Sequence, residues 1–123
     1  MKTIMLVDDS ATILLSISNI LAKAGYATEK AANAEEALNL LEHTYQSVVL
    51  SDVDLGDGMH GVELMRLIAQ RYPFLPRILM SGLPPEILPS RYGLSENHAL
   101  LSKPFTIPQL DASIRQAIAN LHH

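Results

Sequence analysis

Short apolar runs alternate with longer stretches of helical periodicity along the chain. The runs stand at residues 4–7, 48–50, 77–80 and 99–101, with a weaker one at 26–31. Between them, apolar residues recur at helical spacing over residues 13–24, 34–41, 62–72 and 107–121. Continuous apolar runs are typical of strands covered on both faces of a parallel sheet. The alternation therefore predicts an α/β fold with helices on both faces of a parallel sheet.

Local signals refine this pattern at several points. Ser10 and Asn33 are suited to cap the first two helices, and Gly25 to end the first. The weak strand at residues 26–31 is expected at an edge of the sheet. Residues 83–97 contain three prolines and a glycine, so we expect any helix there to be short, about two turns from the first prolines.

Length and composition restrict the class of protein. The 123 residues fit a single domain spanning residues 1–123, and 48% apolar with 18% charged residues is ordinary for a folded chain. The net charge of −4 without a basic run predicts no direct binding of nucleic acid. No stretch is long enough to span a membrane, and the absence of cysteine fits the cytoplasm. His122 and His123 are native or the start of a purification tag.

Polar side chains follow four of the predicted strands directly. Asp8 and Asp9 follow the first strand, Asp52 the third, Ser81 the fourth and Lys103 the last. The carboxyl ends of parallel strands share one edge of the sheet, where ligands of open α/β folds bind. We therefore expect one pocket with three carboxylates, a hydroxyl and an ammonium group. This set of groups is typical of magnesium-assisted phosphoryl transfer.

Electrostatics favours a divalent cation in such a pocket. Two carboxylates about 4 Å apart repel by roughly 4 kcal/mol at an effective dielectric constant near 20, and a cation removes that cost. Magnesium prefers oxygen ligands and keeps open positions for phosphate oxygens, whereas zinc prefers histidine or cysteine. Lys103 adds a positive charge suited to a phosphate oxygen, and Ser81 adds a hydrogen-bond donor.

Each of these residues alone also has an ordinary structural explanation. Asp8, Asp9 and Ser10 could simply cap the first helix, while Asp52 and Ser81 could occupy turns. Their joint placement at four strand ends favours a functional site. The histidines share no spacing typical of a metal site, and we interpret them as surface residues: His43, His60, His98, His122 and His123.

Taken together, the motifs resemble the receiver domain of two-component response regulators, a flavodoxin-like family. The resemblance covers essentially the whole chain and rests on residues 4–9, 48–52, 79–82 and 102–105. It implies a doubly wound (βα)5 sandwich whose five parallel strands are ordered 2-1-3-4-5, here with a short or irregular fourth helix.

The resemblance also implies a role for each site residue. Asp52 would accept a phosphoryl group from a phosphohistidine of a histidine kinase or phosphotransfer protein. Asp9 and Asp52 would bind Mg²⁺ directly, the backbone carbonyl of Asp54 would complete the protein ligands, and Asp8 would act through a water. Ser81 and Lys103 would bind the phosphoryl oxygens, with a cis peptide bond before Pro104 aiming Lys103 inward.

The family's switch would then control a downstream effector protein or output domain by shifting a population of conformers. Three features depart from the family pattern. The loop from Asp52 to Gly61 is one residue longer than is common, with Gly56 where a proline is usual. The aromatic switch position holds Leu100, and the proline-rich segment 83–97 weakens the usual dimerisation face, so we expect a monomer or weak dimer.

Two other functions remain open at this point. Asp52 and Asp54 also resemble the paired aspartates of haloacid-dehalogenase-type phosphohydrolases, although those enzymes carry the pair on the first strand and need more chain for a cap. A degenerate receiver that binds partners without phosphorylation is the third possibility. The intact acidic pair, Asp52, Ser81 and Lys103 favour a competent phosphoacceptor that is not an enzyme in the usual sense.

Overall fold

A parallel sheet forms the centre of the fold. The computed structural model describes residues 2–56, 58–93 and 99–120. In these ranges five strands form one sheet in the order β2-β1-β3-β4-β5, which confirms the predicted topology. The strands are β1 (Thr3–Val7), β2 (Ala27–Ala31), β3 (Val48–Asp52), β4 (Arg77–Ser81) and β5 (Leu100–Ser102).

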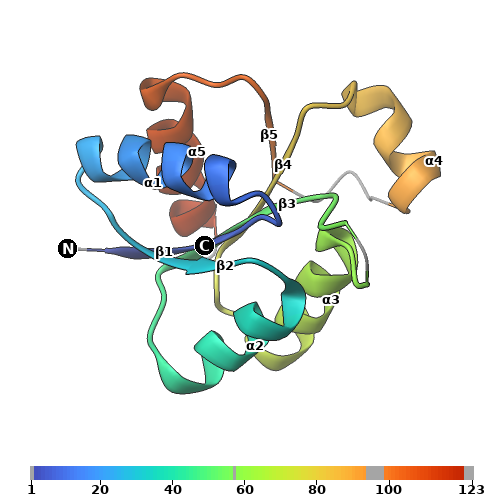
Figure 1. The fold of residues 1–123 in the computed structure, drawn as a ribbon, viewed down its shortest axis with the longest axis horizontal. Coiled ribbons are helices and arrows are strands. Elements are labelled where there is room, and N and C mark those ends of the chain that lie inside the picture. Colours follow the sequence, from blue (N-terminus) through green and yellow to red (C-terminus); the bar gives the residue numbers. More distant parts are fainter. Residues whose placement is uncertain (1, 57, 94–98, 121–123) are drawn as a thin grey trace.

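Two pairs of helices cover the two faces of the sheet. Figure 1 shows α1 (Ala11–Lys23) and α5 (Ile107–Asn120) on one face. It shows α2 (Ala34–His43) and α3 (Gly61–Arg71) on the other. The helices α1, α2 and α3 each return the chain to the start of the next strand, as a right-handed crossover requires. None of the described helices has the length and apolar character needed to cross a lipid bilayer.

Alternate residues of the strands build two separate apolar cores. On β1, Ile4 and Leu6 pack toward α1 and α5, whereas Met5 and Val7 pack toward α2 and α3. All four are fully buried, because the sheet is covered on both faces. Burial on both faces explains why the sequence shows a continuous apolar run here and not an alternation.

The weak strand lies at the edge, as expected. β2 pairs with β1 along its whole length, from Thr3 opposite Ala27 to Val7 opposite Ala31. Edge strands contribute less apolar surface, and only Ala31 of β2 is buried. The strand begins one residue later than the pattern predicts, because the Tyr26 amide donates to the Leu21 carbonyl of α1 at 2.9 Å. The Tyr26 hydroxyl donates to Asp111 Oδ1 of α5 at 2.5 Å.

The predicted caps are present. Ser10 Oγ accepts from the Ile13 amide at 3.3 Å and Asn33 Oδ1 from the Glu36 amide at 2.9 Å. At α3 the capping residue is His60, whose Nδ1 accepts from the Glu63 amide at 3.4 Å. His60 is a partly exposed surface residue, and its ring also packs edge to face against Tyr92 at 5.3 Å.

The other histidines are less informative. His43 is exposed at the end of α2. The remaining three lie outside the described residues: His98, His122 and His123.

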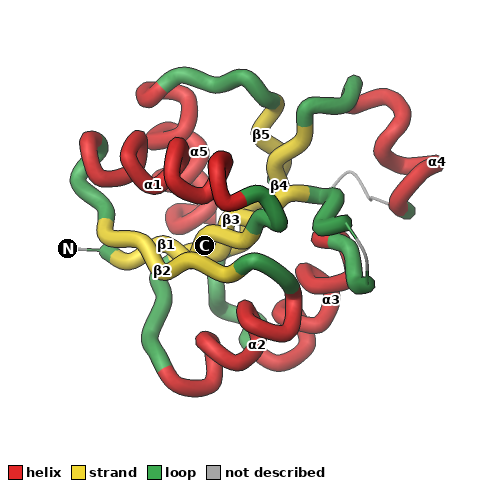
Figure 2. The backbone as a smooth tube through the Cα atoms, in the orientation of Figure 1, coloured by secondary structure: helices red, strands yellow, loops and turns green. Residues whose placement is uncertain are grey.

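The fourth helical segment is short, as the prolines predict. A turn of 3-10 helix (Pro85–Ile87) leads into α4 (Leu88–Tyr92), which ends at Gly93 with a positive φ of 67°. Leu88 is the residue of α4 that is buried, and Arg66 of α3 donates to the Gly93 carbonyl at 3.0 Å. Figure 2 shows α4 standing apart from α1 and α5, beyond the β4 and β5 side of the sheet.

Candidate functional site

The carboxyl ends of the strands gather the polar residues that the sequence singles out. Asp8 directly follows β1, Asp52 is the last residue of β3, and Ser81 is the last residue of β4. Strand register places Asp52 opposite Met80, one residue before Ser81. The Lys103 amide donates to the Ser81 carbonyl at 2.8 Å, which fixes the lysine at the same edge.

Lys103 joins two of the carboxylates. Its Nζ donates a hydrogen bond to Asp52 Oδ2 at 3.0 Å and lies 3.6 Å from Asp8 Oδ2. The second distance is too long for a hydrogen bond, so it is an electrostatic contact only. The peptide bond between Lys103 and Pro104 is cis. Two carboxylates, at the ends of β1 and β3, thus meet at the ammonium group of Lys103, which follows β5.

Asp8 is the buried member of this group. It is 1% exposed, and its Oδ1 accepts from the Ser10 amide at 3.0 Å. Its Oδ2 is buried without a hydrogen-bond partner. Burial raises the pKa of Asp8 above its ordinary value, the nearby Asp52 adds to the rise, and the Ser10 amide and Lys103 oppose it. Two acids facing one lysine leave this pocket short of positive charge.

The loop after β3 holds the remaining acids. Asp52 Oδ1 accepts from the Asp54 amide at 3.3 Å, and Asp54 Oδ1 accepts from the Gly56 amide at 2.9 Å. Gly56 has a φ of +76°, and a Cβ placed on it would come within 2.7 Å of Asp9 Oδ2. The carboxylate of Asp9 therefore lies against this glycine, and a side chain at position 56 would push it away.

Gly61 is a position that sequence reasoning missed. A Cβ on this residue would lie 1.9 Å from the Asp52 carbonyl oxygen and 3.1 Å from Ser51 Oγ. The start of α3 therefore packs directly against the end of β3. The Gly61 amide donates to the Val53 carbonyl at 2.9 Å. The glycines of this loop were visible in the sequence, but their contacts depend on how the loop folds back.

Ser81 is buried, and its Oγ accepts from the Leu83 amide at 3.0 Å. Accepting that bond leaves the hydroxyl proton free to be donated elsewhere. The position expected to lack an aromatic switch, Leu100, begins β5 and packs, partly buried, against the core on the α2 and α3 side. Leucine has neither a hydroxyl group nor an aromatic ring, so this side chain cannot respond to Ser81 as an aromatic switch residue would.

The donor set suits a hard divalent cation. The buried Asp8 Oδ2 beside Asp52 has no hydrogen-bond partner and shares the single Lys103 charge with Asp52, and no sulfur or imidazole ligand lies among the site residues. In the described residues no three acidic, histidine or cysteine side chains are already gathered as a metal-binding group. The arrangement of Asp8, Asp9 and Asp52 around one ion, with the Asp54 carbonyl, therefore stays a prediction.

Comparison with known proteins gives a family and several relatives. Residues 4–115 match the response regulator receiver domain. The DNA-binding transcriptional regulator NtrC of Escherichia coli is 32% identical over 120 residues, which is 95% of this chain and 25% of NtrC. The regulator DctD of Rhizobium meliloti is 30% identical over 94% of this chain and 25% of its own length. The chain thus spans about a quarter of these curated relatives.

Solved structures agree with this match. A signal receiver domain of an HD domain-containing protein from Pseudomonas fluorescens superposes with a TM-score of 0.84 and 32% identity, covering 98% of this chain and 89% of that one. The chemotaxis response regulator CheY4 of Vibrio cholerae gives 0.79 and 27% identity, covering 95% and 98%. With the family match over most of its length, the chain belongs to the response regulator receiver domain family of two-component systems, whose role is to accept a phosphoryl group.

Proposed function

We propose that Asp52 is the phosphoacceptor of this receiver domain and that Asp8, Asp9, Ser81 and Lys103 serve it. The observation that carries the proposal is the meeting of Asp52 and Asp8 at Lys103 Nζ, 3.0 and 3.6 Å away. Asp52 is the candidate nucleophile because its side chain is partly accessible, whereas Asp8 is 1% exposed. A nucleophile must reach the phosphorus of a partner, and a buried carboxylate cannot.

In the transfer step, a carboxylate oxygen of Asp52 attacks the phosphorus of a phosphohistidine. The new P–O bond forms as the P–N bond breaks, and the electron pair of that bond returns to the imidazole nitrogen. Asp52 needs no proton transfer, since its carboxylate is already the reactive form. The product is an acyl phosphate, which water later hydrolyses to restore Asp52 and release phosphate. Small phosphodonors such as acetyl phosphate would react in the same way.

Lys103 changes partner during this reaction. Its hydrogen bond to Asp52 Oδ2 neutralises part of the negative charge that an incoming phosphate would meet. Once the phosphoryl group is attached, the same ammonium group can follow the charge to a phosphoryl oxygen. A flexible lysine stem suits such a shift better than a rigid guanidinium fork.

The residues present fit Mg²⁺. Asp9 and Asp52 would hold it with the Asp54 carbonyl, and Asp8 would act through a bound water. When bound, the ion neutralises charge on the carboxylates and on the phosphoryl oxygens. Asp8 supports this assignment most directly, because its buried Oδ2 has no hydrogen-bond partner and its pKa is raised mainly by burial.

Ser81 is the candidate switch. Phosphorylation adds a charge of about −1.5 to −2 and three strong acceptors at this edge. The hydroxyl proton of Ser81 is free to be donated to one of them, but its Oγ also accepts from the Leu83 amide. Drawing Ser81 toward the phosphoryl group would therefore pull on residue 83 and on the segment that leads to α4. This segment is the movable element in the proposal.

The partners follow from the chemistry and from the family. A histidine kinase or a phosphotransfer protein would supply the phosphoryl group, and a downstream effector protein or output domain would read the change. Residues 1–123 would act as one receiver unit in this scheme. With α4 reduced to five residues, the unit is expected to be a monomer or a weak dimer.

A phosphohydrolase is the weaker alternative. Asp52 is the last residue of the third strand of the chain and not of the first strand, and Asp54 Oδ1 accepts from the Gly56 amide. A general acid needs access to the leaving group, and this contact directs the Asp54 side chain into its own loop. Multiple turnover of phosphate monoesters would be the sign of that activity.

The test is incubation with acetyl phosphate and Mg²⁺, followed by intact mass measurement. We expect the wild-type protein to gain one phosphoryl group and Asp52→Asn to gain none, because the amide is not a nucleophile. Glu42→Gln, at an exposed acid on α2, is the matched control and should be labelled like the wild type. Unchanged labelling of Asp52→Asn would contradict the proposal.

A further inference from the structure

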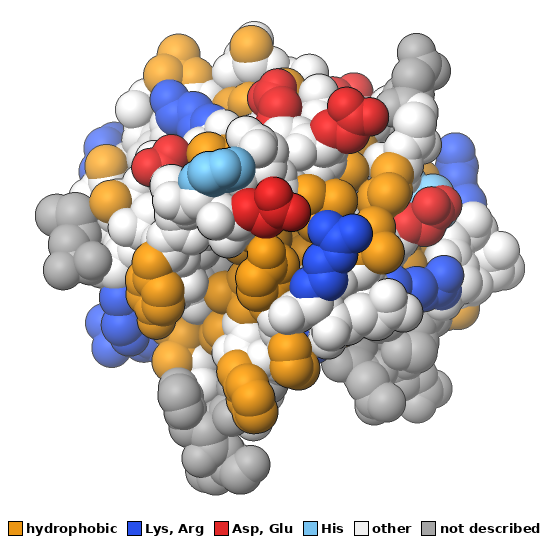
Figure 3. Space-filling model, turned by 90° about the horizontal axis from the view of Figure 1, so that it is seen from below, with side chains coloured by type: hydrophobic (Ala, Val, Ile, Leu, Met, Phe, Trp, Pro, Cys, Tyr) orange, Lys and Arg blue, Asp and Glu red, His pale blue; other side chains and the backbone are white. Residues whose placement is uncertain are grey.

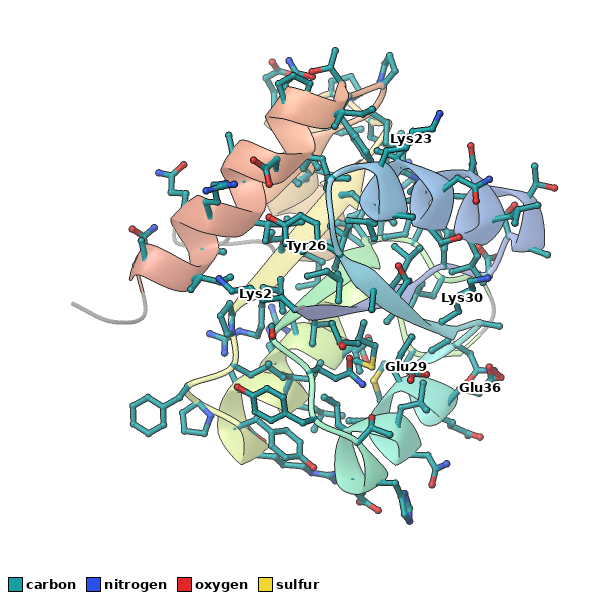
Figure 4. The ribbon with its side chains drawn as sticks, turned by 90° about the vertical axis from the view of Figure 1, so that its left-hand side faces the viewer. Lys2, Lys23, Tyr26, Glu29, Lys30 and Glu36 are labelled. Carbon is teal, nitrogen blue, oxygen red and sulfur yellow. The ribbon has the colours of Figure 1, made fainter. Side chains whose placement is uncertain are left out.

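A pocket lies at the amino ends of the strands, at the opposite end of the sheet from Asp52. It lies where β1, β3 and β4 begin and has a volume of about 680 Å³, within the range of ligand sites in proteins. Figure 4 looks toward this end of the sheet, with Lys2 at the start of β1. Each strand is only five residues long at most, so about 16 Å of sheet separates this pocket from the acidic edge. The two sites share no residue.

Two aromatic rings stand at the pocket with little of their surface covered. Tyr45 follows α2 and is 86% exposed, and Phe74 follows α3 and is 84% exposed. Large apolar side chains are usually covered in a folded protein, so two such rings lining one hollow mark a binding surface. In Figure 3, which looks at the α2 and α3 side of the molecule, hydrophobic side chains reach the surface between charged ones.

The charges of the pocket are of one sign. Lys2 and Arg71 contribute to its lining, and none of the described residues that line it is acidic. This contrasts with the net charge of −4 of the whole chain. A cationic hollow in an acidic protein favours an anionic ligand, and exposed aromatic rings favour a planar one.

Gln46, which also lines the pocket, has an unsatisfied acceptor. The side chain is 4% exposed, and its Oε1 has no hydrogen-bond partner. The amide orientation is fixed by its neighbour: Thr44 Oγ1 gives its only proton to the Leu40 carbonyl at 2.6 Å, so it can only accept from Gln46 Nε2, also at 2.6 Å. Oε1 must therefore face away from Thr44. Buried acceptors of this kind are rare and costly, and a ligand donor is one way to satisfy them.

We propose that this pocket binds a small planar anion, an aromatic or heteroaromatic ring bearing a carboxylate, sulfonate or phosphate group. Tyr45 and Phe74 would cover the ring, and Lys2 and Arg71 would bind the acidic group. An N–H donor on the ligand would complement Gln46 Oε1. Because the pocket lies at the opposite edge from Asp52, the ligand and a phosphoryl group could be carried at the same time.

The test uses anilinonaphthalene sulfonate, a fluorescent aromatic anion with an N–H donor, titrated against the folded protein. We expect saturable binding that Phe74→Ala and Arg71→Gln each weaken about tenfold, since they remove a ring and a charge from the pocket. Leu15→Ala and Lys23→Gln, at exposed positions on α1, are the matched controls and should not change the affinity. Absence of saturable binding, or equal loss in the controls, would overturn the proposal.

Gln46→Leu supplies a second measurement. Removing the unsatisfied acceptor while keeping the volume should raise the urea midpoint of the free protein and weaken binding of the dye. A lower midpoint with unchanged dye affinity would show that Gln46 serves only the fold, against the proposal.

Competition separates the possible ligands. Displacement of the dye by adenosine monophosphate supports a heteroaromatic phosphate, and displacement by naphthoate supports an aromatic carboxylate. Failure of both to displace the dye would overturn the proposed ligand class. Loss of dye binding as protein concentration rises, with dimers in light scattering, would show that a second copy of the chain covers the pocket instead.

Discussion

Asp8 and Asp111 are two aspartates of one small fold with opposite surroundings. Asp8 is buried beside Asp52 with one lysine between them, and burial raises its pKa. Asp111, on α5, accepts from the Tyr26 hydroxyl and the Arg115 guanidinium, and these hydrogen bonds lower its pKa. One oxygen of Asp8 has no hydrogen-bond partner, whereas both oxygens of Asp111 accept a hydrogen bond. The contrast sets the acidic strand ends, where we propose that Mg²⁺ and a phosphoryl group bind, against a contact that holds α5 to Tyr26, just before β2.

The largest expected effect comes from removing Mg²⁺. Chelation with EDTA should lower labelling of Asp52 by acetyl phosphate roughly hundredfold or more, because the charge of the phosphoryl oxygens is then no longer neutralised. The contact of Tyr26 with Asp111 and Arg115 involves no cation, so the far-ultraviolet circular dichroism should stay the same. The urea midpoint should fall, because Mg²⁺ bound only to the folded protein stabilises it. Full labelling in EDTA, confirmed by intact mass, would show that Lys103 alone balances the acidic edge.

Gly61→Ala should have the next largest effect. The added Cβ would lie 1.9 Å from the Asp52 carbonyl oxygen, so the start of α3 must move. Overpacking of this kind costs about 1–3 kcal/mol, more than the gain of up to about 1 kcal/mol from replacing glycine in a helix. Urea unfolding measures the difference. Gly82→Ala, where a Cβ meets nothing within 4 Å, should leave the unfolding free energy nearly unchanged.

Asp8→Asn should stabilise the protein in the absence of Mg²⁺, by roughly 1 kcal/mol at neutral pH, because it removes a buried negative charge beside Asp52. The pH dependence follows from the raised pKa. The protonated form of Asp8 is favoured in the folded state, so its stabilising contribution is full below the ordinary value of 3.8 and is lost as pH rises through the raised pKa.

The advantage of Asp8→Asn should therefore be small near pH 4 and grow toward neutral pH. Unfolding in urea at several pH values measures this. A variant less stable than the wild type at neutral pH would show that the Asp8 carboxylate is well satisfied in the fold.

Tyr26→Phe tests the other half of the comparison and should have the smallest effect. Burial, with the hydrogen bond to Asp111, raises the pKa of Tyr26 from 10 to about 12. Its contribution to stability is thus full below pH 10 and is lost as pH rises through about 12. For Asp111, whose pKa is lowered, the contribution is present above 3.8 and is lost as pH falls through the lowered value.

The variant should therefore lose stability at neutral pH and become less sensitive to both extremes. The tyrosinate absorbance titration should lose its highest step, while a normal titration of Tyr26 in the wild type would contradict the assignment. Tyr45→Phe, at an exposed ring, is the matched control.

Much of the fold could be predicted from the sequence because the sheet is buried on both faces. Residues 4–7 form a continuous apolar run for that reason, and prolines 84, 85 and 89 restrict the fourth helix by their own geometry. That Asp8, Asp52 and Lys103 share one edge follows from strand ends alone. The cap at His60 could not be predicted, because histidine is not a usual capping residue and its ring is fixed by Tyr92 of α4.

The details of the site depend on loops, whose paths the sequence pattern does not determine. Nothing in the order of residues predicts that Asp9 lies against Gly56, or that Gly61 meets the Asp52 carbonyl. The pocket was missed for a related reason. Tyr45 and Phe74 are far apart in the sequence, and they line one pocket because β3 and β4 begin side by side.

The division of the interior by the sheet has a consequence for recombination between relatives. Side chains that face α2 and α3 come from alternate strand positions and do not touch those that face α1 and α5. A block comprising α2, α3 and the alternate strand residues beneath them could be exchanged for that of another receiver without repacking the opposite side. Chimeras designed along this boundary should inherit each parent's interior intact, whereas crossovers placed by sequence position alone would mix the two.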